Sequence, residues 1–95
     1  MAPGTAPALA LAGAFPNPSH HGATALRFAL PSSAPATLEL LDVQGRRVFA
    51  REVGAMGAGS HQVEIGGASR LAPGVYAARL AQGGLVRCAR VVVLD

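Results

Sequence analysis

Cysteine, tryptophan and lysine are scarce or absent in this chain of 95 residues. Cys88 is the one cysteine, and there is no tryptophan. A single cysteine excludes an internal disulfide and a zinc site built from several cysteines, so packing alone has to stabilise the domain. All eight basic side chains are arginine, which together with 20 alanines indicates a coding bias rather than a function.

Long apolar runs are also missing. No stretch approaches the roughly 20 apolar residues of a membrane-spanning helix, and glycine and proline interrupt every window in which a helical apolar period could develop. The alanine-rich start lacks a positive n-region and contains Pro3 and Pro7, unlike a signal peptide. We therefore expect no integral membrane segment, a linker or tail at residues 1–8, and one domain at residues 9–95.

The charge balance is basic without being clustered. Five acidic residues against eight arginines give a net charge of +3, but the arginines are scattered along the chain. One tyrosine and three phenylalanines cannot supply both a core and a platform for base stacking. We therefore expect no nucleic-acid partner.

Short alternating segments between turn signals are what the chain does contain. The pattern is clearest from Ala23 to Leu30, where apolar residues with Phe28 among them alternate with a face that includes Arg27. Glycine and proline recur every few residues. The predicted fold is an all-β, immunoglobulin-like β-sandwich of about seven antiparallel strands in two sheets. The predicted strands are residues 9–14, 23–30, 37–41, 47–53, 61–65, 75–80 and 85–94.

Two connections carry recognisable turn chemistry. Asp42-Val43-Gln44-Gly45 fits a type I turn, with Gly45 at a position that needs a positive φ. On the returning strand, Val48 is predicted to point inward. Phe15-Pro16-Asn17-Pro18 ends the first strand, since two prolines prevent a central ladder, and a loop from Ser19 to Gly22 is expected to follow.

Four motifs follow one another along the chain. They are Phe15-Pro16-Asn17-Pro18, then Leu40 to Arg46, then Gly59 to Val63, then Leu71 to Tyr76. In this order they resemble the C-terminal sorting domain of the type IX (Por) secretion system. They are equally similar to the flagellar hook-capping-type immunoglobulin-like domain of exported bacterial proteins. The resemblance extends from Phe15 to the end of the chain.

The resemblance implies a non-catalytic C-terminal sorting module that directs an attached cargo through an outer-membrane translocon. Its implied partners are this secretion machinery and an upstream cargo domain of a longer parent protein. Its implied location is the cell surface or the medium, reached via the periplasm. The motif residues carried over by position are Asn17, Asp42, Gly45, Gly74 and Tyr76. The predicted recognition residues are Tyr76 and the pair nearest to the family's lysine-rich ending, Arg87 and Arg90.

Two other functions stay open at this point. One is a structural or carbohydrate-proximal accessory domain of a secreted enzyme, and the other is a hook-capping-like assembly domain. Where the hook-capping branch has Trp-Asp-Gly, this chain has Glu64-Ile65-Gly66, which favours the sorting branch.

Histidine, serine, cysteine, tyrosine and glutamate side chains are often catalytic or metal-binding, but in this chain we interpret them as structural or surface residues. No spacing points to a metal, a cofactor, a nucleophile elbow or a pair of carboxylates, so we expect no enzyme, no catalytic residue and no metal ligand. Cys88 is expected to be half-buried, and Tyr76 to form a tyrosine corner, its hydroxyl bonded to upstream backbone. His20, His21 and His61 are expected on loops or strand surfaces, and Glu39, Glu52 and Glu64 on solvated faces. Ser19, Ser60 and Ser69 are expected to form no catalytic triad.

The alternation between Ala23 and Leu30 makes a testable prediction. Phe28→Ala should lower the free energy of unfolding by about 3–4 kcal/mol, as for buried aromatic side chains. Arg27→Ala, on the opposite face, should cost under about 0.5 kcal/mol. Denaturant titration of both variants measures the difference, and equal losses would mean that the faces are assigned the wrong way round.

Overall fold

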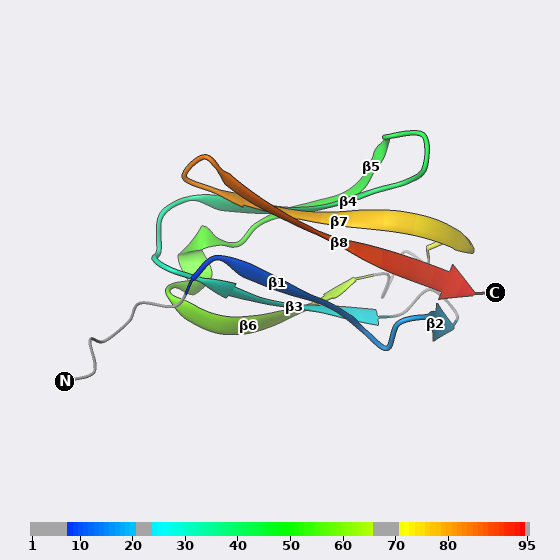
Figure 1. Cartoon of the computed structure of the whole chain (residues 1–95), viewed down its shortest axis with the longest axis horizontal. Coiled ribbons are helices and arrows are strands. Elements are labelled where there is room, and N and C mark those ends of the chain that lie inside the picture. The colour runs from blue at the N-terminus through cyan, green and yellow to red at the C-terminus, as the bar shows by residue number, and fades with distance from the viewer. Residues whose placement is uncertain (1–7, 21–23, 66–70, 95) are drawn as a thin grey trace.

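Two layers of β-strands make up residues 8–20, 24–65 and 71–94, the part of the chain that the computed structural model describes (Figure 1). A three-stranded sheet has the order β1-β3-β6, and a five-stranded sheet has the order β2-β8-β7-β4-β5. The bounds are β1 Ala10–Phe15, β2 Ser19–His20, β3 Thr24–Leu30, β4 Ala36–Leu41, β5 Arg47–Glu52, β6 Gly59–Ile65, β7 Gly74–Gln82 and β8 Leu85–Leu94. The predicted two-sheet β-sandwich is confirmed.

The core lies between the sheets and follows the predicted alternation. On β3, Leu26 and Phe28 are buried while Arg27 between them is exposed. Leu38 of β4 and Leu80 of β7, directly opposite each other in the larger sheet, are fully buried. Burial of each such side chain stabilises the fold by about 1.5–3 kcal/mol, which offsets the ordering of a chain without disulfides.

The turn between β4 and β5 has the predicted form. The N–H of Gly45 donates to the carbonyl of Asp42 at 2.9 Å, as in a type I turn, and Gly45 has a φ of 83°. The Asp42 side chain adds two bonds, since its Oδ1 accepts from the N–H groups of Gln44 and Arg46. The turn assignment from sequence is therefore confirmed.

The predicted orientation of Val48 is wrong. Val48 is 45% exposed, and Phe49 is the half-buried residue of β5. The ladder between β4 and β5 shifts register between Leu40 and Leu41, so that Phe49 lies opposite Leu40 while Arg47 lies opposite Leu41. The irregularity moves each later side chain to the other face, which simple alternation from the turn does not foresee.

Two short elements were not predicted. Ser19 and His20, expected in a loop, form β2 and pair in parallel with Val93 and Leu94 of β8. A single 3-10 turn, η1 (Gly54–Met56), lies between β5 and β6. Both elements are too short to leave a periodic signal in the sequence. The described residues therefore form eight strands rather than about seven.

The corner where β5 ends is fixed by Glu52 and Gly54. The Oε2 atom of Glu52 accepts hydrogen bonds from the N–H of Ala36 at 2.8 Å and of Gly54 at 3.1 Å. The bond from Ala36 is the main reason that the pKa of Glu52 lies below its usual value. Glu52, expected on a solvated face, is exposed as predicted, but its carboxylate also ties the corner to the start of β4.

Gly54 has no room for a side chain. A Cβ built on it would clash with the carbonyl oxygen of Ala34, and it would lie 2.8 Å from the nitrogen of Ala36 and 2.9 Å from Oε2 of Glu52. The two atoms from Ala34 and Ala36 belong to the backbone, so no side-chain rotation relieves the clash.

We therefore predict that Gly54→Ala destabilises the protein by about 1–3 kcal/mol or more, the range for overpacking. Ala58→Ser, an exposed change in the same loop, should cost under about 0.5 kcal/mol. Thermal melts of the two variants test this. Equal melting temperatures would contradict the backbone contact at Gly54.

Candidate recognition surface

The last hairpin, formed by β7 and β8, carries the predicted recognition residues. Its register runs without interruption from Gly74 opposite Val93 to Gln82 opposite Leu85. Arg87 lies opposite Leu80, whose side chain points into the core, whereas Arg90 lies opposite Ala77 on the outer face. Because paired residues share a face, Arg87 and Arg90 project from opposite faces of β8. Both are exposed, but they do not form one patch.

The charges of this strand have no acidic partner within the described part of the chain. The carboxylate of Glu39, expected to be solvated but only 16% exposed, lies 2.8 Å from Arg47 and 3.7 Å from Arg79. Arg46 lies 2.9 Å from Asp42. Arg87 donates from Nη1 to the neighbouring carbonyl of Val86 at 3.0 Å. Arg87 and Arg90 are thus exposed cations of β8 that have no ion-pair partner among the described residues.

Tyr76 begins the buried face of β7. Its hydroxyl donates to the carbonyl of Ala72, four residues upstream, at 2.6 Å, and the residue is only 7% exposed. The bond is the contact expected of a tyrosine corner, and it ties the approach to β7 against the core. A partner could reach little of the ring, so Tyr76 supports the position of β7 and β8.

Asn17 connects the two sheets through its side chain. Its Nδ2 donates to the carbonyl of Arg90 at 3.0 Å, and its Oδ1 accepts from the N–H of Val92 at 3.0 Å. A carbonyl and an N–H two residues apart on one side of a strand are what a neighbouring strand normally bonds. The amide therefore occupies the place of a strand on β8, directly before β2 continues the pairing.

The remaining motif residues shape turns and strand ends. Asp42 also bonds Arg46 from Oδ2 to Nε at 2.9 Å, and the N–H of Arg46 is the largest influence that lowers the pKa of Asp42. Gly45 closes the same turn, and Gly74 is the first residue of β7, opposite Val93. Asp42, Gly45 and Gly74 therefore shape the hairpins, and none of them covers β8.

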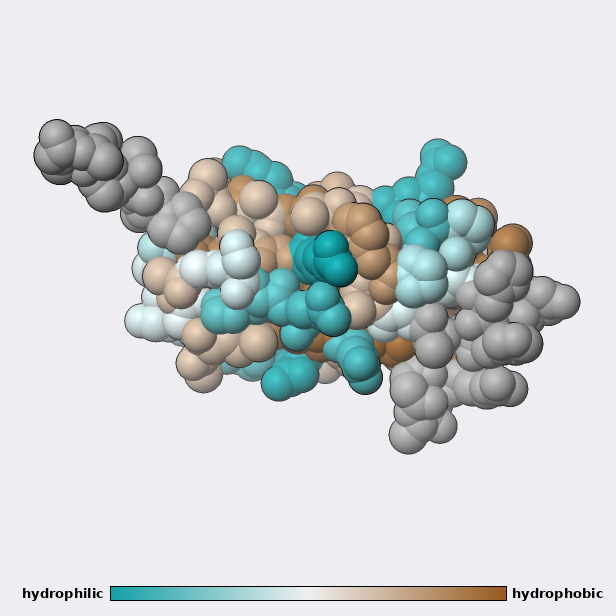
Figure 2. All heavy atoms as spheres, turned by 90° about the horizontal axis from the view of Figure 1, so that it is seen from below, coloured by the Kyte–Doolittle hydropathy of each residue, from teal (hydrophilic) through white to brown (hydrophobic). Residues whose placement is uncertain are grey.

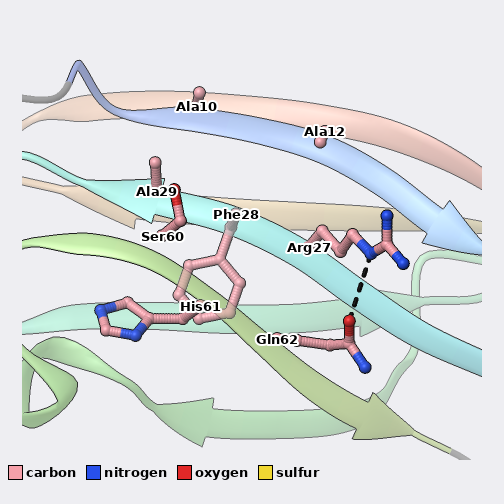
Figure 3. Close-up of a pocket in the computed structure, with 8 residues that line it drawn as sticks. All are labelled: Ala10, Ala12, Arg27, Phe28, Ala29, Ser60, His61 and Gln62. Carbon is pink, nitrogen blue, oxygen red and sulfur yellow. Dashed lines mark hydrogen bonds between the residues drawn. The ribbon is translucent and has the colours of Figure 1, made fainter.

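A shallow hollow of about 470 Å³ lies on the outer side of the three-stranded sheet, with alanines and the Arg27–Gln62 hydrogen bond of 3.2 Å along it (Figure 3). Arg27 also stacks over the Phe15 ring, 4.4 Å from its centroid. Polar and apolar residues are interspersed over this side of the molecule (Figure 2). The lining contains no carboxylate, so the hollow offers no acid–base pair.

The histidine, serine and glutamate side chains of the described residues do not gather into one site. Ser60 and His61 are consecutive in β6 and point to opposite faces, and the Nε2 atom of His61 bonds the Gly57 carbonyl at 2.6 Å. Ser19 is fully buried, Glu64 is exposed, and His21 and Ser69 lie outside the described residues. Within the described ranges, no three histidine, cysteine, aspartate or glutamate side chains gather as a metal site would require.

The predicted burial of Cys88 is wrong. Cys88 is exposed on the outer face of β8, beside a hollow of about 350 Å³ that Val43, Val75 and Arg90 help to line. The three-stranded sheet covers only the inner face of the larger sheet, so no described element packs on Cys88 on the outer face of β8. Alternation groups Cys88 with Arg90 on one face of the strand but cannot show that this face is uncovered.

Comparison with known protein families matches residues 13–94 to the secretion system C-terminal sorting domain. This match spans most of the chain. The chain belongs to this family. Comparison with curated proteins finds no match.

The family gives the sorting domain its function. It is a C-terminal sorting signal for type IX secretion of a cargo protein. Such domains are non-catalytic modules of proteins that are secreted or exported to the cell surface, and they interact with the secretion machinery. The predicted sorting function and location are confirmed. Among the residues described here, no helix is long and apolar enough to span a membrane.

Sequence reasoning singled out Asn17 of the sorting domain by resemblance but did not find what it does. The relevant signal is two prolines flanking a residue with both an amide donor and an amide acceptor. Such a segment cannot offer a normal ladder, but the asparagine side chain has both a donor and an acceptor and can replace one rung of it.

We predict that Asn17→Ala lowers the free energy of unfolding by about 1–2 kcal/mol, because two hydrogen bonds of about 1 kcal/mol each are lost. Asn17→Asp should not restore stability, since a carboxylate accepts from Val92 but repels the Arg90 carbonyl. Gln44→Ala, in an exposed turn, serves as the control. Urea titration decides, and an Asn17→Ala variant as stable as the control would contradict the role of the amide.

Proposed function

We propose that residues 9–95 act as the sorting domain, that residues 1–8 are its linker or tail, and that the cargo is an upstream domain of the same protein. In this proposal the domain performs no chemistry. The outer-membrane secretion machinery recognises the folded sandwich at β8, and Arg87 and Arg90 supply the positive charge that the machinery recognises. The attached protein reaches the translocon via the periplasm.

The observation that carries the proposal is the exposure of β8. Its burial pattern is exposed from Leu85 to Cys88 and again at Arg90, whereas Val91 and Val93 are fully or almost fully buried. One strand thus contains a half whose alternate side chains pack in the core and a half whose side chains are mostly accessible. Accessible charges change association rates more than they change stability, which suits a signal that is recognised after folding.

The contacts of four other arginines support a protein partner rather than a nucleic acid. Arg46, Arg47 and Arg79 lie within 4 Å of acidic side chains, and Arg27 is stacked on Phe15. A nucleic-acid surface would need these cations clustered and available.

The proposal includes a relationship between this domain and the hook-capping-type immunoglobulin-like domain, and the two-sheet architecture supports it.

The accessory-domain function differs from the sorting function in one measurable respect. A spacer needs a stable sandwich but no particular charge on β8.

Export of a reporter fused ahead of residues 1–95 in a type IX-competent host tests the proposal. Arg87→Gln combined with Arg90→Gln should leave the melting temperature nearly unchanged, because exposed substitutions move stability by less than about 0.5 kcal/mol each. The same double variant should reduce export.

The control is Arg46→Gln combined with Arg51→Gln, which removes the same charge from exposed positions on the β4–β5 hairpin. This variant should be exported like the wild type. Full export of the Arg87/Arg90 variant would remove β8 from the recognition surface and favour the accessory-domain function.

A further inference from the structure

The edge of β8 is divided into an occupied and an open part. Since Asn17 reaches the carbonyl of Arg90 and the N–H of Val92 from the side away from β7, the backbone groups of the even-numbered residues of β8 point to this edge. β2 pairs further along, at Val93 and Leu94. From the N–H of Arg90 back to Val86, no described strand bonds the edge.

The open part consists of the backbone groups of Val86 and Cys88 and the N–H of Arg90. Of these, the Val86 carbonyl accepts a bond from the Arg87 guanidinium. Val86 is 40% and Leu85 is 51% exposed. An exposed, partly apolar strand edge is a template for a further strand, and charged side chains on it limit unselective pairing.

The charges select among possible occupants. In a two-fold antiparallel pair of two copies centred on Cys88, Arg87 would lie opposite Ala89 of the second copy and diagonal to the second Arg87. Like charges in neighbouring positions oppose pairing. A strand with carboxylates opposite Arg87 and Arg90 would instead form two ion pairs, one on each face of the extended sheet.

We infer that the open half of β8, from Val86 to Arg90, accepts an extended acidic strand of the secretion machinery by strand addition. The inference rests on the proposed function, because it gives the mode of recognition at the same surface. Backbone bonds to Val86, Cys88 and Arg90 provide the attachment. On the acidic strand, the two carboxylates are three residues apart, and apolar side chains lie opposite Val86 and Cys88.

A synthetic peptide with this pattern, Thr-Glu-Thr-Val-Glu-Val-Thr, is the probe. Aligned antiparallel to β8, it sets its glutamates opposite Arg90 and Arg87 and its first valine opposite Cys88. Fluorescence anisotropy measures the binding of this peptide to the full chain. Binding should slow amide hydrogen exchange at Cys88 and Arg90. Replacing both glutamates with glutamine should weaken binding about threefold to tenfold, and added salt should weaken it as well.

N-methylation of the peptide tests the backbone bonds without altering the protein. A methyl on the valine opposite Cys88 blocks its bond to the Cys88 carbonyl and should abolish binding. A methyl on the threonine opposite Ala89, whose N–H points away from β8, should leave binding intact. Equal affinities of the two methylated peptides, or equal affinities of the glutamate and glutamine peptides, would overturn the inference.

Cys88→Pro tests the same edge from the protein. It removes an N–H that points away from β7, a position where edge strands accept proline. Ala50→Pro is the matched control on β5, the other edge strand of the sheet. The Val53 N–H bonds the Ala36 carbonyl across the ladder, so the N–H of Ala50 points away from β4. Only Cys88→Pro should lose peptide binding and export.

The outcomes separate the inference from the proposed function. Full export of Cys88→Pro, with reduced export of the Arg87/Arg90 double variant, would overturn strand addition and leave the charge-based recognition intact. Full export of both would overturn both. A dimer of the wild-type chain by sedimentation equilibrium that Cys88→Pro abolishes would identify a second copy as the occupant and would overturn the acidic strand.

Discussion

The side-chain amide of Asn17 takes the place of a strand on β8, and the arrangement of both sheets at this end of the sandwich depends on it. The chain leaves β1 in one sheet and joins the other sheet at β2 (Figure 1). Between them, Pro16 and Pro18 have no N–H to donate. The segment is held instead by Asn17 on β8 and by the hydroxyl of Thr24, which donates to the Pro16 carbonyl at 2.8 Å. The prolines and the asparagine thus act together.

The same amide divides β8 into two parts. Beyond Arg90 the strand is closed by Asn17 and β2, and Val91 and Val93 pack into the core. Before Arg90 the strand is paired on one side only, and its side chains are exposed on both faces. A sorting signal must be present in the folded domain and yet be accessible to the secretion machinery. Under the proposed recognition at β8, dividing one strand in this way satisfies both requirements, since recognition then does not need the core to open.

Much of the fold followed from local patterns in the sequence. The alternation of β3 and the turn from Asp42 to Gly45 depend on neighbouring residues, and both were predicted correctly. The exposure of Val48 and Cys88 depends on a register shift and on the width of the opposing sheet, which lie beyond any local window. Resemblance identified Asn17, but its two bonds join positions more than 70 residues apart. Gly54 is required because the backbone of Ala34 and Ala36 passes close to it, which no turn rule expresses.

Amide hydrogen exchange along β8, measured residue by residue, tests the division of this strand most directly. The N–H groups of Ala89 and Val91 face β7 and should exchange slowly. The N–H of Val92 should also be slow, because Asn17 accepts its hydrogen bond. The N–H groups of Cys88 and Arg90, directed to the open edge, should exchange orders of magnitude faster, as exposed and unbonded amides do. Protection of Cys88 and Arg90 equal to that of Val92, or exchange at Val92 as fast as at Cys88, would contradict the division.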